Sequence, residues 1–342
     1  MVGRIIKKTG NSTVIFANGR LFSLPFVSKH NTGDIIDSND NLLNNCLNTK
    51  PLNILKKAHE YYTKKFRFLK SIRDFFTKEG FIEVFTPKLK ENIITEPNIN
   101  YIKTANGILA PSPEVEIKKL LSLGFDKIFE LCWVYRDDMK DNLHKQEFLM
   151  LEFYEVLSKP YEIINLLIKL IKHISDKSFK ERYNLDTVEY IEYKEAFKRF
   201  ASLDTDKTDL EKLKIEFNIE GDVSIDEILD LIFGLKVEKQ LGKTHPMVIY
   251  NFPASRASLA KVIDNKTQRF EFYLGGVELA NCYLEQIDAK AIEERFCCDE
   301  VFFKAMEFGL PPLSGIAVGV ERLFMVLERF DGILEEWIWQ NF

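Results

Sequence analysis

The stretch between Phe129 and Val156 constrains the fold of this chain more than any other part of its 342 residues. Two segments rich in aromatic and β-branched residues flank a polar loop, Asp137–Gln146. The second segment alternates apolar and polar residues, as a strand with one buried face does. The pattern therefore predicts an antiparallel strand–loop–strand and, with it, a chain built on an antiparallel sheet.

The second strand of this pair carries a carboxylate on a face that is otherwise apolar. Period-two geometry puts on one side of the strand Phe148, Met150, Glu152 and Tyr154. A buried carboxylate needs a cationic partner or a ligand. Because Arg136 ends the first strand beside the loop, a structural pair with Glu152 and a phosphate-binding arginine are both open from these residues alone.

A second strand pair is predicted at Phe270–Leu284, where Gly275-Gly276 is typical of a two-residue turn. Such a turn pairs Tyr273 with Glu278 and makes Glu271 a diagonal neighbour of Glu278 on the same face. Two carboxylates at this spacing suit Mg²⁺ that is also bound by nucleotide phosphates. An exposed hairpin with two solvated glutamates explains the same residues.

Two further polar residues, Asn281 and Glu285, lie four positions apart on the second strand of this hairpin. Strict alternation puts them on the face opposite to Glu278. They reach the same ligand as Glu278 only if a bulge or bend intervenes, so the sequence leaves the composition of this site open.

The run Gly309–Leu323 predicts a turn, a short strand and a helix that begins near Gly319. Glycines let the backbone approach a flat ligand, and Arg322, one turn into the helix, could stack on a base. Ordinary strand-to-helix packing explains this run equally well when it is taken alone.

Composition and charge exclude several classes of protein. No apolar run reaches the roughly 18 residues of a membrane span, and the N-terminus lacks a signal-peptide pattern, so we expect a cytoplasmic protein. The cysteines show no C-x-x-C spacing, which argues against a zinc site or a disulfide framework. The net charge of −5 excludes nucleic-acid binding through overall charge but leaves a local basic patch open.

Turn signals divide the chain into two predicted domains. Short strand patterns separated by Asn-Gly and Gly turns predict a small OB-like or hairpin β module at residues 1–45. A polar linker at 46–51 follows, and we expect one larger domain over 52–342. Within it we expect helices at 52–78, 116–123, 161–175 and 319–329, strands at 81–86 and 247–252, and an excursion from the sheet at 187–245.

Taken together, these segments resemble class II aminoacyl-tRNA synthetases over roughly residues 52–335. Arg136 with its loop and Glu147-Phe148 resembles motif 2, and Gly315–Arg322 resembles motif 3. Phe75–Leu89 resembles the motif 1 helix and strand at the dimer interface. The resemblance implies an α+β fold, in which an antiparallel sheet is flanked by helices, and a homodimer.

The subgroup is similar to the lysyl-tRNA synthetase branch, on the runs Ser112-Pro113-Glu114 and Glu278–Asn281. Only about 50 residues precede the core, too few for the anticodon-binding domain of those synthetases. Phe252–Ala260 and Ser314–Gly319 look most like the elongation factor P–(R)-β-lysine ligase family. Ala317 stands where lysyl-tRNA synthetases typically have glycine, and its methyl group would favour a β-amino acid by about 1–3 kcal/mol.

The resemblance implies a role for each matching residue. For ATP it implies contacts from Arg136, Asp137, Asp138, His144, Lys145, Phe148, Glu278, Leu279, Gly319 and Arg322. For the amino acid it implies contacts from Ser112, Pro113, Glu114, Glu152, Tyr154, Asn281, Glu285 and Ala317. Glu271 and Glu278 would hold Mg²⁺, and the catalytic residues would be Arg136, Glu278 and Arg322.

The implied reaction activates lysine or (R)-β-lysine with ATP as an acyl-adenylate and transfers it to a lysine of elongation factor P. The many carboxylates around the implied amino-acid site suit a substrate with two ammonium groups. Two other functions stay open: a compact lysyl-tRNA synthetase that charges tRNA, and a non-catalytic paralogue that binds an amino acid or RNA.

Overall fold

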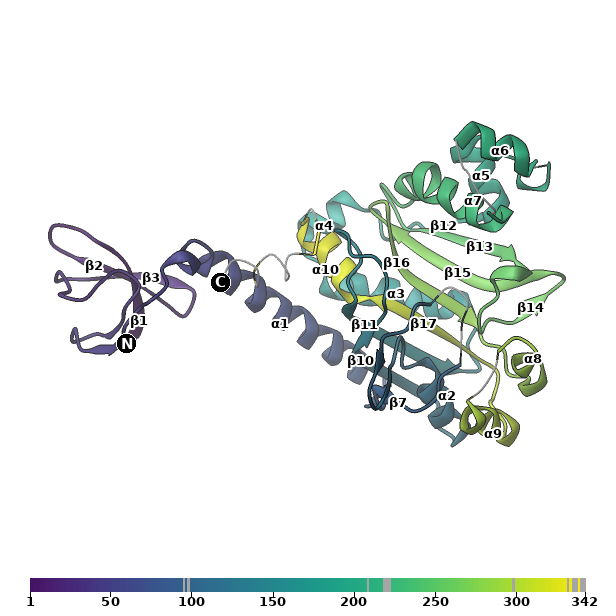
Figure 1. The fold of residues 1–342 in the computed structure, drawn as a ribbon, viewed down its shortest axis with the longest axis horizontal. Helices are drawn as coiled ribbons and strands as arrows, with labels where there is room; N and C mark the ends of the chain where they lie inside the picture. The colour runs from purple at the N-terminus through teal and green to yellow at the C-terminus, as the bar shows by residue number, and fades with distance from the viewer. Residues whose placement is uncertain are drawn as a thin grey trace. The chain divides into compact units, whose positions relative to one another are not determined.

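The computed structural model describes residues 1–94, 96, 99–207, 209–217, 223–296, 299–330, 332–333 and 338. Its contacts divide the chain into two compact units, Met1–Lys70 with Ile333–Phe342 and Ser71–Gly332. The long helix α1 (Leu55–Lys78) begins in the first unit and ends in the second. Figure 1 shows both units, and the domain limits predicted at residues 45 and 52 remain predictions.

The smaller unit contains an antiparallel sheet with the strand order β3-β2-β1-β4-β5. Its strands are β1 (Val2–Lys8), β2 (Thr13–Ala17), β3 (Arg20–Leu24), β4 (Ile35–Asp37) and β5 (Leu42–Asn44). Ile5, Ile15 and Ile36 form its buried core. Asn18 and Gly19 have φ angles of 48° and 75°, which gives the tight turn predicted between β2 and β3. The small N-terminal β module is therefore confirmed, and β5 is a strand that the sequence did not predict.

A nine-stranded sheet organises the described part of the larger unit, with the order β12-β13-β15-β16-β17-β11-β10-β6 and with β14 paired to β15. Two pairs, β12–β13 and β10–β6, are parallel, and the other pairs are antiparallel. The strands are β6 (Ile82–Glu83), β10 (Lys127–Tyr135), β11 (Glu147–Val156), β12 (Glu189–Glu192), β13 (Met247–Pro253), β14 (Val262–Ile263), β15 (Lys266–Leu274), β16 (Val277–Leu284) and β17 (Leu313–Gly319). The predicted α+β class with an antiparallel sheet is confirmed.

One face of this sheet is covered by α1 and α3 (Pro160–Ile174). Phe76 of α1 stacks on Phe129 and tilts against Phe153, with ring centroids 4.8 Å and 4.7 Å away. Each such aromatic pair adds about 0.5–1.5 kcal/mol beyond the area it buries. At the other end of this face the Sγ of Cys282 donates to the carbonyl of Pro160. These contacts leave the opposite face of the sheet for a site.

Two groups of helices pack on the two ends of that opposite face. At the β12–β13 end, Tyr193 and Phe197 of α5 (Tyr193–Ala201) join a core with Tyr273. At the β10 end, α2 (Glu114–Ser122) and α9 (Glu300–Phe308) join a core with Tyr154. The middle of the face, at β16, β17 and β11, lies between these groups (Figure 1).

The remaining described elements are short. The helices are α4 (Lys177–Arg182), α6 (Leu210–Phe217), α7 (Ile225–Ile232), α8 (Ala289–Glu293) and α10 (Val320–Glu328), with single turns at Lys50–Asn53, Thr205–Lys207, Phe233–Val237, Glu238–Gln240 and Ala254–Arg256. A separate sheet has the order β7-β9-β8, from β7 (Leu89–Lys90), β8 (Lys103–Thr104) and β9 (Gly107–Leu109). Within the described ranges, none of the helices has the length and apolar character needed to cross a bilayer.

The segment that resembles motif 1 is held by a buried carboxylate. Glu130, 1% exposed, accepts hydrogen bonds from the backbone N–H and the hydroxyl of Thr86 at 2.9 Å and 2.7 Å. The ammonium group of Lys88 lies 2.7 Å from the same carboxylate. Because a buried carboxylate is costly without such partners, Glu130 fixes this segment against β10.

Candidate active site

Strand register brings the predicted polar residues onto one face of the sheet. Residues directly opposite one another in neighbouring strands point to the same side. Glu152 lies opposite Ala317, Ala317 opposite Asn281, and Asn281 opposite Glu271. This row crosses β11, β17, β16 and β15, so four residues far apart in the sequence lie side by side.

A bulge in β16 brings Glu278 onto the same face. The turn at Gly275-Gly276 pairs Tyr273 with Glu278 as predicted, but the next pair is Phe272 with Ala280, so Leu279 is an extra residue. Beyond a bulge the alternation is reversed. Glu278 and Asn281 therefore both face the row, which answers the question that strict alternation left open.

Glu152 lies at the bottom of a buried acidic pocket and is 1% exposed. Its two carboxylate oxygens accept hydrogen bonds from the hydroxyl of Ser112 at 2.6 Å and from that of Tyr154 at 2.8 Å. Burial, followed by repulsion from Glu114, raises the pKa of Glu152 to about 8. The ion pair with Arg136 that the sequence left open is not formed within the described part of the chain.

The cation of this pocket is Lys118, whose side chain is fully buried between two carboxylates. Its ammonium nitrogen lies 2.7 Å from Glu114 and 2.6 Å from Glu285. Burial alone would lower the pKa of Lys118, but the two carboxylates outweigh it and raise that pKa. Glu285 is also buried, and burial raises its pKa to about 8 even though Lys118 opposes the shift.

Three neighbouring positions shape the floor of the pocket. The side-chain oxygen of Asn281 is buried and accepts no hydrogen bond from the described residues, so it can accept one from a ligand. Ala317 lies between Asn281 and Glu152 in the row and adds a methyl group there. The ring of Tyr154 lies directly over Gly315, where a Cβ atom would come within 2.0 Å of it.

Two arginines lie near the row, Arg136 close to Glu152 and Arg322 close to Glu278. Arg136 donates from Nε to the carbonyl of Pro111 at 3.2 Å, and its guanidinium lies 5.5 Å from the centroid of Phe148. Arg322 donates to the carbonyl of Glu278 at 3.1 Å, while its distance to the Glu278 carboxylate is 3.6 Å. Both guanidinium groups are thus held by backbone carbonyls, and a planar guanidinium suits the binding of phosphate.

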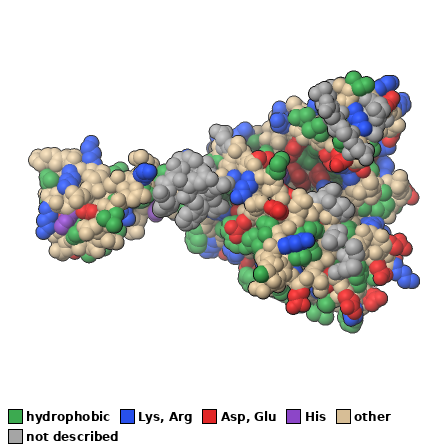
Figure 2. All heavy atoms as spheres, in the orientation of Figure 1, with side chains coloured by type: hydrophobic (Ala, Val, Ile, Leu, Met, Phe, Trp, Pro, Cys, Tyr) green, Lys and Arg blue, Asp and Glu red, His purple; other side chains and the backbone are tan. Residues whose placement is uncertain are grey.

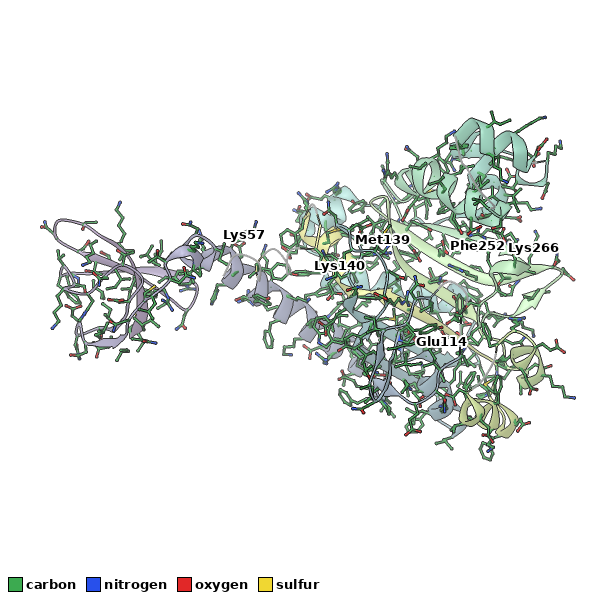
Figure 3. The ribbon with its side chains drawn as sticks, in the orientation of Figure 1. Lys57, Glu114, Met139, Lys140, Phe252 and Lys266 are labelled. Atoms are coloured by element: carbon green, nitrogen blue, oxygen red, sulfur yellow. The ribbon has the colours of Figure 1, made fainter. Side chains whose placement is uncertain are left out.

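The loop between β10 and β11 reaches Arg322. Arg322 donates to Nε2 of His144 at 2.7 Å, and Nδ1 of His144 lies 2.9 Å from Asp141. Asp138 accepts a hydrogen bond from Asn100 at 3.2 Å, and Asp137 accepts one from Gln146 at 2.7 Å. In Figure 3 the labelled Met139 and Lys140 mark this loop, and Glu114 marks the acidic pocket.

The two carboxylates predicted to hold Mg²⁺ lie near one another but differ in their partners. Both oxygens of Glu271 accept hydrogen bonds, from Arg269 and from Tyr273, each at 2.5 Å. Glu278 is half-buried, with 31% of its side chain exposed, and burial together with repulsion from Glu271 raises its pKa to about 7. Among the described residues there is no cluster of three or more metal-binding side chains, so a Mg²⁺ ion here needs phosphate oxygens as well.

Sequence reasoning missed three charged residues of this face. Lys118 follows Glu114 by one helical turn, and Arg269 precedes Glu271 by two strand positions, so both spacings were readable. Glu96 has no such signal. Burial and repulsion from Glu114 raise its pKa, and it accepts a hydrogen bond from Ser258.

An opening leads to the acidic pocket. The residues that line this opening include Ser112, Glu114 and Glu96, together with Lys90 and Asp299. In Figure 2 acidic side chains gather in the hollow between the α5–α7 helices and the body of the larger unit. The row Glu152, Ala317, Asn281 and Glu271 thus runs from the acidic pocket around Lys118 to Glu278 and Arg322.

Comparison with known proteins matches most of the larger unit. The family described as "tRNA synthetases class II (D, K and N)" matches residues 51–336. A protein of Avibacterium paragallinarum named elongation factor P–(R)-β-lysine ligase is 33% identical over 306 residues, covering 79% of this chain and 91% of the relative. Proteins of the same name from Haemophilus influenzae strain KW20/Rd and from Edwardsiella ictaluri are each 32% identical, over 78% and 80% of this chain and 90% of each relative.

Proposed function

This chain belongs to the class II tRNA synthetase family of the D, K and N type and is an ATP-dependent ligase, and from this premise we propose that it joins (R)-β-lysine or lysine to elongation factor P. The amino acid is first activated as an acyl-adenylate. The acyl group then passes to the ε-amino group of a lysine on elongation factor P. The names of the relatives at 32–33% identity support this acceptor.

The acidic pocket is the observation that supports a dicationic amino acid. Glu96, Glu114, Glu152 and Glu285 lie around one buried cation, Lys118. Burial raises the pKa values of Glu152 and Glu285 to about 8, because the pocket holds too few positive charges to keep both ionised. A substrate with two ammonium groups supplies the missing charge, and lysine and β-lysine both have two.

Ala317 favours the β-amino acid of the two. It lies between Glu152 and Asn281, the residues that we expect to bind the amino groups. An extra methyl group at this point disfavours a ligand that needs the space, by about 1–3 kcal/mol. Moving the amino group one carbon farther from the carboxylate leaves room for the methyl group. (R)-β-lysine is therefore the preferred substrate in this proposal.

In the first step a carboxylate oxygen of the amino acid attacks the α-phosphorus of ATP, and pyrophosphate leaves. The nucleophile is already ionised, so no general base is needed. Arg136 binds the α-phosphate, His144 and Lys145 bind the distal phosphates, and adenine lies against Phe148 and Arg322. Glu271 and Glu278 would hold Mg²⁺, which neutralises phosphate charge. Catalysis is then positioning and charge neutralisation.

In the second step the neutral ε-amine of the acceptor attacks the acyl carbon. A new amide bond forms, the bond to the phosphate breaks, and AMP leaves while the amine releases a proton. The substrate ammonium groups stay bound to the carboxylates and do not compete as nucleophiles, because an ion-paired ammonium has no free electron pair.

We also propose a homodimer in the cytoplasm. The resemblance of Phe75–Leu89 to motif 1 supports the dimer, and so does the exposure of Ile82 and Phe85, at 54% and 80%. The cytoplasm follows from the proposed acceptor and from the use of ATP. The mass of the purified protein in solution tests the dimer, and a monomer at micromolar concentration would contradict it.

Two assays test the function. ATP–pyrophosphate exchange is measured with (R)-β-lysine, α-lysine and leucine, and we expect that order of kcat/KM, with no exchange above background for leucine. Radiolabelled amino acid is then offered together with purified elongation factor P and total tRNA. We expect label on elongation factor P. Label on tRNA alone would contradict the proposal and support a compact lysyl-tRNA synthetase instead.

A further inference from the structure

The opening to the acidic pocket has apolar walls and charged residues beside them. The apolar part of its lining is buried and includes Ile94, Ala110 and Leu259. Lys90, Glu116 and Asp299 also line it, and the activation of the amino acid proposed above uses none of these three. Apolar walls next to charged groups suit a side chain such as that of lysine, whose apolar stem precedes its amine.

The charged residues of the opening form a chain of ion pairs, which we call the mouth cluster: Lys90, Glu116, Lys119 and Asp299. The Nζ atom of Lys90, whose side chain is 10% exposed, contacts the carboxylate of Glu116. The same carboxylate lies 3.0 Å from Nζ of Lys119, and that nitrogen lies 3.0 Å from Asp299. Two carboxylates thus face two ammonium groups, so the mouth cluster has no negative charge left over for a further cation.

The charged groups around the mouth cluster are held by partners of their own. Lys88 lies 2.7 Å from Glu130, and Glu114 lies 2.7 Å from Lys118. The pKa of Glu96 is raised, first because the side chain is buried. Among the described residues that line the opening, each carboxylate therefore has a cationic partner or, in the case of Glu96, a raised pKa.

The mouth cluster and the acidic pocket act in opposite directions on an amine. Burial lowers the pKa of Lys90, Glu116 opposes this without cancelling it, and the ammonium groups of Lys119 and Lys88 lower the pKa further. At Lys118 of the acidic pocket, two carboxylates outweigh burial and raise the pKa. An amine in the pocket is thus kept protonated, whereas an amine at the mouth loses its proton more easily.

We propose that this opening admits the acceptor lysine and that the mouth cluster converts its ammonium group into the neutral amine. The inference rests on the function proposed above. The acceptor ammonium loses a proton to water, because a third positive charge beside Lys90 and Lys119 is unfavourable. The neutral amine attacks the acyl carbon, a C–N bond forms, the bond to the phosphate breaks, AMP leaves, and the new amide nitrogen releases a second proton.

The test follows transfer separately from activation. The full chain forms the adenylate from ATP and (R)-β-lysine, and transfer to purified elongation factor P is measured in a single turnover between about pH 6.5 and 9.5. We expect the rate to rise with pH, with a midpoint at least about one unit below the pKa of about 10.4 of a free lysine. Lys90→Met should raise the midpoint by about one unit, so that at pH 7.5 the ratio of transfer to ATP–pyrophosphate exchange falls about 10-fold.

Two further variants separate charge from packing and from proton transfer. Lys90→Arg keeps the positive charge but accepts no proton in this pH range, so it should retain the midpoint of the unaltered chain. Lys119→Met should raise the midpoint in the same direction by about half a unit, which tests the inference even if Lys90→Met does not fold. The matched control is Lys304→Met, which removes a lysine of α9 that is 68% exposed and pairs with Glu300. It should change the transfer rate less than about 2-fold.

The outcomes distinguish this inference from the function on which it rests. If elongation factor P is labelled but Lys90→Met and Lys119→Met leave the midpoint unchanged, or lower the rate equally at every pH, the inference is wrong and the proposed function stands. A loss of transfer in Lys90→Arg would mean that Lys90 itself takes the proton and would also overturn it. If the unaltered chain exchanges pyrophosphate but labels no elongation factor P, the proposed acceptor and this inference both fail.

Discussion

The two ends of the active-site face contrast in how their charged groups are held. At the acidic end, Glu152 and Glu285 are buried around a single lysine, and their pKa values rise to about 8. Arg136 and Arg322, by contrast, donate to backbone carbonyls. The comparison teaches that the acidic end is incomplete without a cationic ligand, while the guanidinium end is ready for an anion.

The largest expected effect lies at the guanidinium end. Arg136→Ala should lower kcat for ATP–pyrophosphate exchange about 100- to 1,000-fold, because charge develops on the α-phosphate that this arginine is proposed to bind. The exposed Arg182→Ala is the control and should change kcat less than 2-fold. If Arg136→Ala has a normal kcat and only a raised KM for ATP, Arg136 contributes to ATP binding but not to stabilisation of the transition state.

Glu278, a carboxylate beside Arg322, gives a second test of how the two ends of the site differ. Glu278→Gln should lower exchange about 100-fold and shift the Mg²⁺ dependence to higher concentration, since the amide is a weaker ligand. Exchange is measured over a range of Mg²⁺ concentrations. Near-normal exchange at ordinary Mg²⁺ would refute the metal role of this residue.

At the acidic end, Glu152→Gln should raise the KM for the amino acid about 10- to 100-fold and leave the KM for ATP unchanged. A charge-assisted hydrogen bond of about 1.5–3 kcal/mol is lost, while the neutral interactions with Ser112 and Tyr154 can persist. Glu155→Gln on the same strand is the matched control. An equal rise in the KM values for ATP and for the amino acid would mean that Glu152 stabilises the structure of the site and does not bind the amino acid directly.

The pH dependence separates the two ends directly. Burial raises the pKa of Glu152 and of Glu285, so both carboxyls hold protons in the empty pocket at pH 6.5. A dication favours the ionised forms, so its binding releases protons, and its affinity should rise about 10-fold or more between pH 6.5 and 8. Calorimetry in buffers of different ionisation enthalpy counts the protons. Affinity for the amino acid that is flat over this range would contradict the assignment.

The smallest effect concerns the choice of amino acid. Ala317→Gly should shift the ratio of kcat/KM for α-lysine over (R)-β-lysine about 5- to 10-fold towards α-lysine, since only one methyl group is removed. The exchange assay with both isomers measures the ratio. A shift in the opposite direction would show that the methyl group contacts the β-amino acid favourably.

Much of the fold could be read from local signals. The turn at Gly275-Gly276 and the alternation in Glu147–Val156 fixed two strand pairs, because turn type and period two act over a few residues. The helices α1, α2, α3 and α10 followed from three- and four-residue spacing. The strand β5 was missed because its residues, Leu42–Asn44, stand in an asparagine-rich stretch that resembles a linker.

The parts of the site that depend on packing between distant elements were not readable. Lys118 of α2 meets Glu285, which follows the end of β16, and Glu96 meets Ser258, which lies 162 positions later in the chain. The bulge at Leu279 has no local signal, although it decides which face Asn281 points to. The roles assigned to individual residues remain predictions.

That one extra residue in β16 has a consequence for how such a pocket can arise or be lost. A substitution changes one side chain of a strand but leaves the other side chains on the faces where they were. Insertion or deletion of one residue moves all the following side chains of the strand to the opposite face of the sheet. A chain that lacked this one residue would have Asn281 and Glu278 on opposite faces of the sheet, so the pocket tolerates many replacements in β16 but no change in the length of this strand.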